Sequence, residues 1–290
     1  MSAHQALHPV ATQCRLLEVS TSGYYAWRFR PASRRARQDE DLTRKIRTIH
    51  ATSRGTYGVP RVHAVLASQG VHVGRKRVAR LMAAADLEGV SRRKPCRTTV
   101  RDPDARPAPD LVDRDFTAAG PDRLWVADIT YIPTTERFLY LAVVLDAWSR
   151  KIVSWAIAAS LHADVVIEAL EIAIEQRKPK GVIHHSDQGT QYTSIEFGIR
   201  CGKYDVRPSM GSVGDAYDNA MCESVFATLE CELLNRVPRQ PHAATRRTIF
   251  EWIEGWYNPH RLHSSLGYLS PVDFERANAE RPSEELCHAK

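Results

Sequence analysis

Residues Leu124–Ile132 read LWVADITYI, a run with the composition of a buried β-strand that carries one carboxylate, Asp128, near its middle. Val, Ile, Trp and Tyr favour strands, and leaving an ionised side chain among them is costly unless a cation or hydrogen-bond donors compensate the charge. Asp128 is therefore the first candidate for a functional residue.

Further extended and helical segments follow this strand. Phe138–Leu145 and Lys151–Ala158 are apolar runs of strand length, separated by turn-like residues, so the three strands predict an antiparallel meander. Beyond them the pattern predicts a helix over 163–176, a strand over 182–185, a helix over 194–201 and a long helix over 215–235. This order indicates an α/β fold whose mixed sheet has helices on its faces.

Two more acidic residues stand at informative places. Asp187 follows the strand over 182–185, and strand ends are where open α/β sheets place ligand sites, although a lone Asp before Gly is more often a turn or capping residue. Glu223 lies on the long helix with Asn219 one turn earlier on the same side, whereas a lone helical Glu is most often solvated surface. The separate apolar stripe on this helix, expected to pack on the sheet, is Met221, Val225, Leu229 and Leu233.

Composition narrows the class of protein. The 290 residues, 43% of them hydrophobic, suffice for two domains, and the six cysteines include no CxxC pair. With no apolar segment after Met1 and no run near the roughly 18 apolar residues of a membrane span, we expect a reduced, cytoplasmic chain without membrane contact.

Charge is unevenly distributed along the chain. Up to Gly120 there are 22 Lys and Arg against 11 Asp and Glu, a balance of +11, and the remaining residues carry 18 against 23, a balance of −5. A basic half suggests binding to a polyanion, although a solvated arginine-rich surface would have the same composition.

The basic half contains a helix-turn-helix pattern. Apolar residues at helical spacing predict a helix from Asp39 onward and two shorter helices that flank the turn Gly70–Gly74. The last helix begins with consecutive basic residues, where recognition helices contact DNA. The candidates for DNA contact, which a solvated basic face could equally explain, are Arg75, Lys76, Arg77 and Arg80.

These patterns divide the chain into five segments. We expect a short helical segment over 1–36, a helix-turn-helix domain over 37–100, a proline-containing linker over 101–120, a catalytic domain over 121–280 and a tail over 281–290.

The three carboxylates have a spacing that identifies a family. Asp187 and Glu223 are separated by 35 residues, as in the D,D(35)E signature of retroviral integrases and many bacterial transposases. The chain closely resembles the second-frame transposase of the insertion-sequence-three family. The matching segments are Trp125–Tyr131, His185–Tyr192 and Asp218–Ser224, residues 257–271 near the C-terminus, and Ser22–Tyr25, Thr56–Gly58 and Val73–Val78 in the basic half.

The resemblance implies an RNase H-like integrase catalytic domain preceded by the all-α helix-turn-helix region. It implies that Asp128, Asp187 and Glu223 hold two divalent ions during cleavage and strand transfer of insertion-element ends. Carboxylate ligands alone favour Mg²⁺ or Mn²⁺, and the scattered His and Cys residues lack the paired spacing of a zinc site. Expected partners are the terminal repeats, target DNA, further copies of the chain and the helix-turn-helix protein of the upstream frame, alone or fused to this chain.

One residue departs from the family pattern. Many members carry Lys or Arg seven residues after the catalytic Glu, where this chain has Glu230, so DNA positioning could pass to a neighbour such as Arg236. Two other functions remain open at this point: an RNase H-like nuclease or resolvase that cuts without joining, and a DNA-binding regulator or inactive remnant that uses only the basic half.

Overall fold

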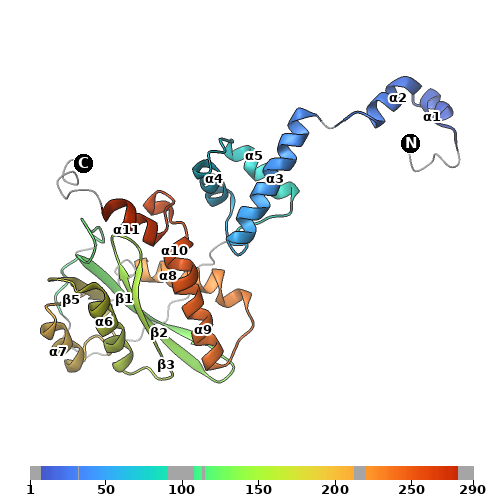
Figure 1. Ribbon diagram of the computed structural model, residues 1–290. Coiled ribbons are helices and arrows are strands. Elements are labelled where there is room, and N and C mark those ends of the chain that lie inside the picture. Colours follow the sequence, from blue (N-terminus) through green and yellow to red (C-terminus); the bar gives the residue numbers. More distant parts are fainter. Residues whose placement is uncertain (1–7, 32, 91–107, 113–114, 212–219, 280–290) are drawn as a thin grey trace. The chain divides into compact units, whose positions relative to one another are not determined.

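The computed structural model describes residues 8–31, 33–90, 108–112, 115–211 and 220–279. The chain forms two compact units, Met1–Glu88 and Gly89–Lys290. Figure 1 labels their helices and strands. Among the helices described, none combines the length and the apolar character needed to cross a membrane.

The first unit is helical. Its helices are α1 (Val10–Leu16), α2 (Thr21–Arg28), α3 (Arg34–Thr52), α4 (Val59–Ser68) and α5 (Arg75–Ala84). Ser20 and Ser33 begin α2 and α3, where their hydroxyls accept hydrogen bonds from the Gly23 and Ala36 N–H groups. Helices α3, α4 and α5 pack around a small apolar core of Leu42, Ile46, Ile49, Val62, Leu66, Val78, Leu81 and Met82.

Helices α4 and α5 form the expected helix-turn-helix. The turn requires Gly70, whose φ of +73° is readily adopted only without a side chain. His63 on α4 holds the end of the turn because its Nε2 lies 2.9 Å from the Val73 carbonyl oxygen. The sequence pattern of this region therefore predicted the observed arrangement.

The second unit is built on a five-stranded sheet in the order β3-β2-β1-β4-β5. Strands β1 (Leu124–Pro133), β2 (Phe138–Asp146) and β3 (Ile152–Ala158) form the antiparallel meander, and β4 (Ile183–Ser186) and β5 (Arg207–Met210) run parallel beyond β1. The mixed sheet confirms the expected RNase H-like α/β domain.

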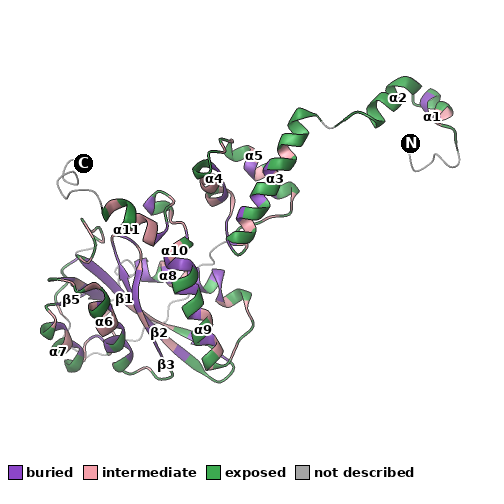
Figure 2. Ribbon diagram, in the orientation of Figure 1, coloured by how far each residue is buried: buried purple, intermediate pink, exposed green. Residues whose placement is uncertain are grey.

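Helices cover both faces of this sheet (Figure 1). Helices α6 (Asp164–Arg177) and α7 (Ile195–Lys203) bury the face that contains Trp125 and Ala127. The alternate residues of β1 face α8 (Ala220–Glu232), where the Cys222 thiol donates a hydrogen bond to the Val126 carbonyl oxygen at 3.4 Å. The strands are buried over most of their length, and the outer sides of the helices are exposed (Figure 2).

The pairing of β1 leaves one of its edges open. Strand β4 pairs only with Leu124–Val126, so among the described strands β1 has no neighbour on that side from Ala127 to Pro133. Because Asp128 is the second residue past the end of this pairing, it lies where the sheet opens toward solvent.

The C-terminal segment fastens α8 and the outer strand β3. Its elements are α9 (His242–Trp252), a π-helical turn (Ile253–Tyr257), α10 (Asn258–His260) and α11 (Pro271–Ala279). The side-chain amide of Asn258 pairs with the backbone N–H and carbonyl of Ile152, each at 3.0 Å. Arg261 is buried and holds Glu232 at the end of α8 through two guanidinium nitrogens.

An ion-pair cluster joins α6 to α11. Arg177 contacts Glu275 at 2.5 Å and Asp122 at 3.0 Å, and Lys151 contacts the other oxygen of Glu275 at 3.3 Å. Burial alone would raise the pKa of Glu275, but the hydrogen bond and charge of Arg177 bring it below the ordinary value.

Two differences from the sequence-based expectation concern the edge of the sheet and the long helix. Strand β5 was not predicted, and α8 ends at Glu232 rather than continuing to Asn235. The helix stops because Leu233 leaves the helical conformation, with φ −127° and ψ −69°, and because Pro238 favours an extended Val237. Residues 215–219 of the predicted long helix lie outside the described residues.

Candidate functional site

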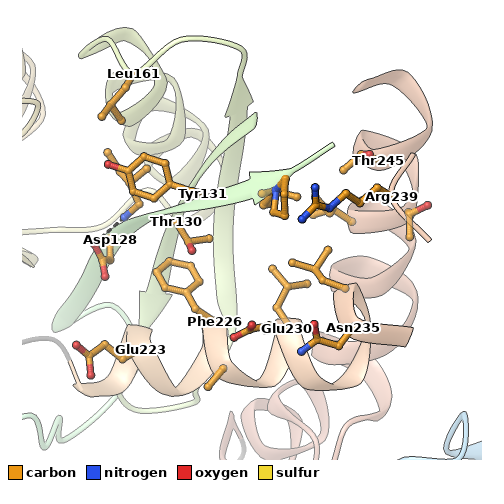
Figure 3. Close-up of a pocket in the computed structure, with 18 of the residues that line it drawn as sticks. Asp128, Thr130, Tyr131, Leu161, Glu223, Phe226, Glu230, Asn235, Arg239 and Thr245 are labelled. Atoms are coloured by element: carbon orange, nitrogen blue, oxygen red, sulfur yellow. Dashed lines mark hydrogen bonds between the residues drawn. The ribbon is translucent and has the colours of Figure 1, made fainter. Parts of the chain in front are cut away.

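A cavity of about 750 Å³ lies between the open edge of β1 and α8. Asp128, Asp187 and Glu223 all line it, so the structure brings the three predicted carboxylates to one place. Figure 3 shows Asp128 and Thr130 on the strand and, across the cavity, Glu223, Phe226 and Glu230 along one side of α8.

The surroundings of Asp128 disfavour its ionised form. Burial raises its pKa well above the ordinary value, and the charges of Asp187 and Glu223 raise it further. The Ile129 N–H donates to Oδ1 at 2.7 Å and opposes this shift only in part. A cation nearby would stabilise the ionised form of Asp128.

Asp187 lies directly after β4. The Gly189 N–H donates to its Oδ1 at 3.1 Å, as in a turn, while burial raises its pKa. A side chain at position 189 would place a Cβ atom 3.0 Å from this oxygen, so glycine permits the close turn. Asp187 thus has both a local structural role and a position on the cavity wall.

Glu223 lies in the first turn of α8 and is exposed. The apolar residues Met221, Val225, Leu229 and Leu233 are buried, as predicted, and leave the Glu223 side of the helix open to the cavity. Asn219, expected one turn earlier, lies outside the described residues.

The donor set fits a hard divalent cation. All three groups offer carboxylate oxygens, which suit Mg²⁺ or Mn²⁺. Besides burial, the charges of Asp187 and Glu223 raise the pKa of Asp128, and a bound cation would relieve their repulsion. Within the described ranges, however, no three His, Cys, Asp or Glu side chains are already arranged around one ion position.

Several residues of the cavity were not anticipated from the sequence. They are Thr130, Tyr131, Phe226, Asn235 and Arg239. Alternation along β1 could have indicated Thr130, and helical spacing from Glu223 could have indicated Phe226. Arg239 lines the cavity, whereas Arg236, the neighbour to which DNA positioning could have passed, does not.

The four basic candidates on α5 fall into two pairs. Arg75 and Lys76 are exposed at the start of the helix. Arg77 and Arg80 instead form ion pairs with Asp39 of α3, each with a shortest distance of 2.6 Å. No local pattern indicates this contact, because Asp39 lies 38 positions before Arg77.

Three family models match the chain. Two are described as an integrase core domain and match residues 118–216 and 204–271. The third, described as an HTH-like domain, matches residues 37–95.

Curated relatives are similar over nearly their whole length. The chain is 40% identical to a Mycobacterium tuberculosis protein assigned as the transposase of insertion sequence element IS986/IS6110, with 90% of this chain and 96% of the relative covered. It is 35% identical to the transposase InsF for insertion sequence IS3A of Escherichia coli, with 95% and 96% covered. Among solved structures, a simian T-cell lymphotropic virus intasome gives a TM-score of 0.49 at 16% identity, covering 81% of this chain and 76% of that chain.

Proposed function

Because the chain belongs to the family of insertion-sequence transposases with an integrase core domain, we propose that it cleaves and joins element ends with two divalent cations held by Asp128, Asp187 and Glu223. The observation that carries this proposal is the convergence of the three carboxylates on one cavity from three separate elements.

The residues of the site have distinct roles in this reaction. Bound Mg²⁺ or Mn²⁺ would activate the attacking water or 3′-hydroxyl and stabilise the leaving oxygen at the phosphodiester. Asp128 and Asp187 are oriented by backbone N–H groups, and Glu223 completes the ligand set from α8. No covalent protein intermediate is needed, and burial raises the pKa of Tyr192 well above its ordinary value, which disfavours it as a nucleophile.

The first unit would bind the DNA. Arg75 and Lys76 are exposed at the N-terminus of α5, where the helix dipole and free N–H groups also favour phosphate. Element terminal repeats and target DNA are the proposed ligands. Several copies of the chain, with or without the upstream-frame protein, would assemble on them in the bacterial cytosol.

The experiment compares three proteins on DNA that carries the two ends of the encoding element. We expect the unmodified chain to yield nicked and joined products with Mg²⁺, and Glu223→Gln to yield neither while still binding the DNA, since Gln keeps the shape and removes the charge. Glu168→Gln is the matched control, because Glu168 is exposed on α6 at the opposite face of the sheet.

Three outcomes would contradict the proposal. Undiminished joining by Glu223→Gln would remove Glu223 from the site. Cutting without joining by the unmodified chain would favour a nuclease. DNA binding with no metal-dependent product would favour a regulator.

A further inference from the structure

The carboxylate of Asp39 binds two of the arginines of α5, one through each of its oxygens. Its Oδ1 accepts a hydrogen bond from Arg77 Nε at 2.7 Å and lies 2.6 Å from Arg77 Nη2, while its Oδ2 accepts one from Arg80 Nη2 at 2.6 Å. The Asp39 side chain is 18% exposed, against 33% for Arg77 and 51% for Arg80. The carboxylate therefore lies behind the two guanidinium groups.

Arg77 and Arg80 are left with different capacities for binding. Arg77 uses the Nε and Nη2 side of its guanidinium on Asp39, and its Nη2 is buried. Arg80 gives only Nη2 to Asp39, and Nη2 carries two hydrogens. One of the two bidentate edges of the Arg80 guanidinium therefore remains complete, on a side chain that is half exposed.

The shared carboxylate also restrains Arg80. A free arginine loses rotamer entropy when it binds, whereas one already held by a carboxylate has lost part of that freedom before binding. A complete bidentate edge in a fixed orientation suits the O6 and N7 acceptors of guanine in the major groove. It suits phosphate less, because the Asp39 charge beside it repels the DNA backbone.

We propose that Asp39 is a specificity-determining positioning residue, which orients Arg80 to read a guanine in a DNA duplex while Arg77 fixes Asp39. The inference rests on the proposed DNA binding by the first unit. It separates the four basic residues by role, with Arg75 and Lys76 binding phosphate and Arg80 reading a base.

The test uses the full chain and a library of randomised DNA duplexes. Binding sites are selected with the unmodified chain, and the ratio of affinities for the selected and a scrambled duplex is then measured for each variant. Asp41→Ala is the matched control. Asp41 lies on the same helix and, among the described residues, forms its ion pair with Arg44 of that helix, so its removal changes the net charge equally without removing a contact to α5.

We expect Asp39→Ala and Arg80→Lys to lower the affinity ratio by about tenfold, as loss of one bidentate guanine contact would. Asp41→Ala should leave the ratio unchanged. Replacing the guanine that Arg80 reads by 7-deazaguanine, which lacks N7, should weaken binding of the duplex by the unmodified chain. Asp39→Ala should be insensitive to that replacement, and its affinity for the scrambled duplex should be equal or higher.

Two results would overturn the inference. If Asp39→Ala gains affinity for all duplexes and its affinity ratio for the selected and scrambled duplexes is unchanged, Asp39 only lowers the local positive charge. If the unmodified chain binds every duplex equally, no base is read and this inference alone fails. Absence of any duplex binding by the unmodified chain would instead refute the proposed function together with it.

Discussion

Replacement of Arg261 by Met should destabilise the second unit more than any exposed ion-pair change. The Arg261 and Glu232 side chains are 3% and 6% exposed, and Nε and Nη2 of Arg261 bind the Glu232 carboxylate at 2.9 to 3.1 Å. Without Arg261, this buried carboxylate would lose the guanidinium that compensates its charge. Such a loss costs about 3–5 kcal/mol, which for a unit of this size lowers the melting temperature by about 6–20 °C.

The assay is thermal unfolding of the full chain, followed by circular dichroism. Arg276→Met is the control, because the Arg276 and Asp273 side chains are 75% and 46% exposed and such pairs contribute about 0–1 kcal/mol. Adding Glu232→Leu to Arg261→Met should restore most of the stability, since an apolar pair replaces a buried ion pair at little cost. An unchanged melting temperature for Arg261→Met, or a double variant no better than the single one, would refute this reasoning.

Three further outcomes are expected. Asp128→Asn should raise the melting temperature of the metal-free protein and abolish its stabilisation by Mg²⁺, because burial and neighbouring charges penalise the ionised form; a lower melting temperature would contradict this. Glu275 has a pKa lowered from 4.5, so it stabilises the fold above that pH and loses this effect as the pH falls through the lowered value. In urea unfolding, the free energy of unfolding of Glu275→Gln should therefore fall furthest below that of the unmodified chain at neutral pH. An equal difference at about pH 3 would exclude the ion pair as its cause. Cys201 should resist alkylation at pH 8 as judged by mass spectrometry, since burial raises its pKa to about 12, and rapid labelling of the folded protein would count against its burial.

The fold was best predicted where apolar residues recur at the regular spacing of a strand or a helix. The apolar run from Leu124 to Ile132 predicted β1, in which Asp128 is half-buried, and the stripe ending at Leu233 predicted which side of α8 packs. These patterns survive because side chains alternate on a strand and repeat every three to four residues on a helix.

The contacts between distant segments could not be predicted in this way. Strand β5 is only four residues long and contains Pro208, so it has no periodic signal and forms because β4 offers it an edge. The pairing of Asp39 with Arg80 and that of Glu232 with Arg261 depend on how helices pack, which a single sequence does not encode locally. Arg239 lines the cavity from the irregular segment between α8 and α9, where no periodic pattern indicates which side chains point inward.

The contact between Asn258 and Ile152 has a consequence for solubility. Strand β3 is one of the two edge strands of the sheet, and an exposed edge of this kind is a template for aggregation between molecules. Asn258 occupies the backbone groups of Ile152 near one end of β3, and Arg246 donates to the Ile157 carbonyl near the other. Side chains thereby occupy both ends of this edge, which opposes pairing with a foreign strand where several copies of the protein are proposed to gather on DNA.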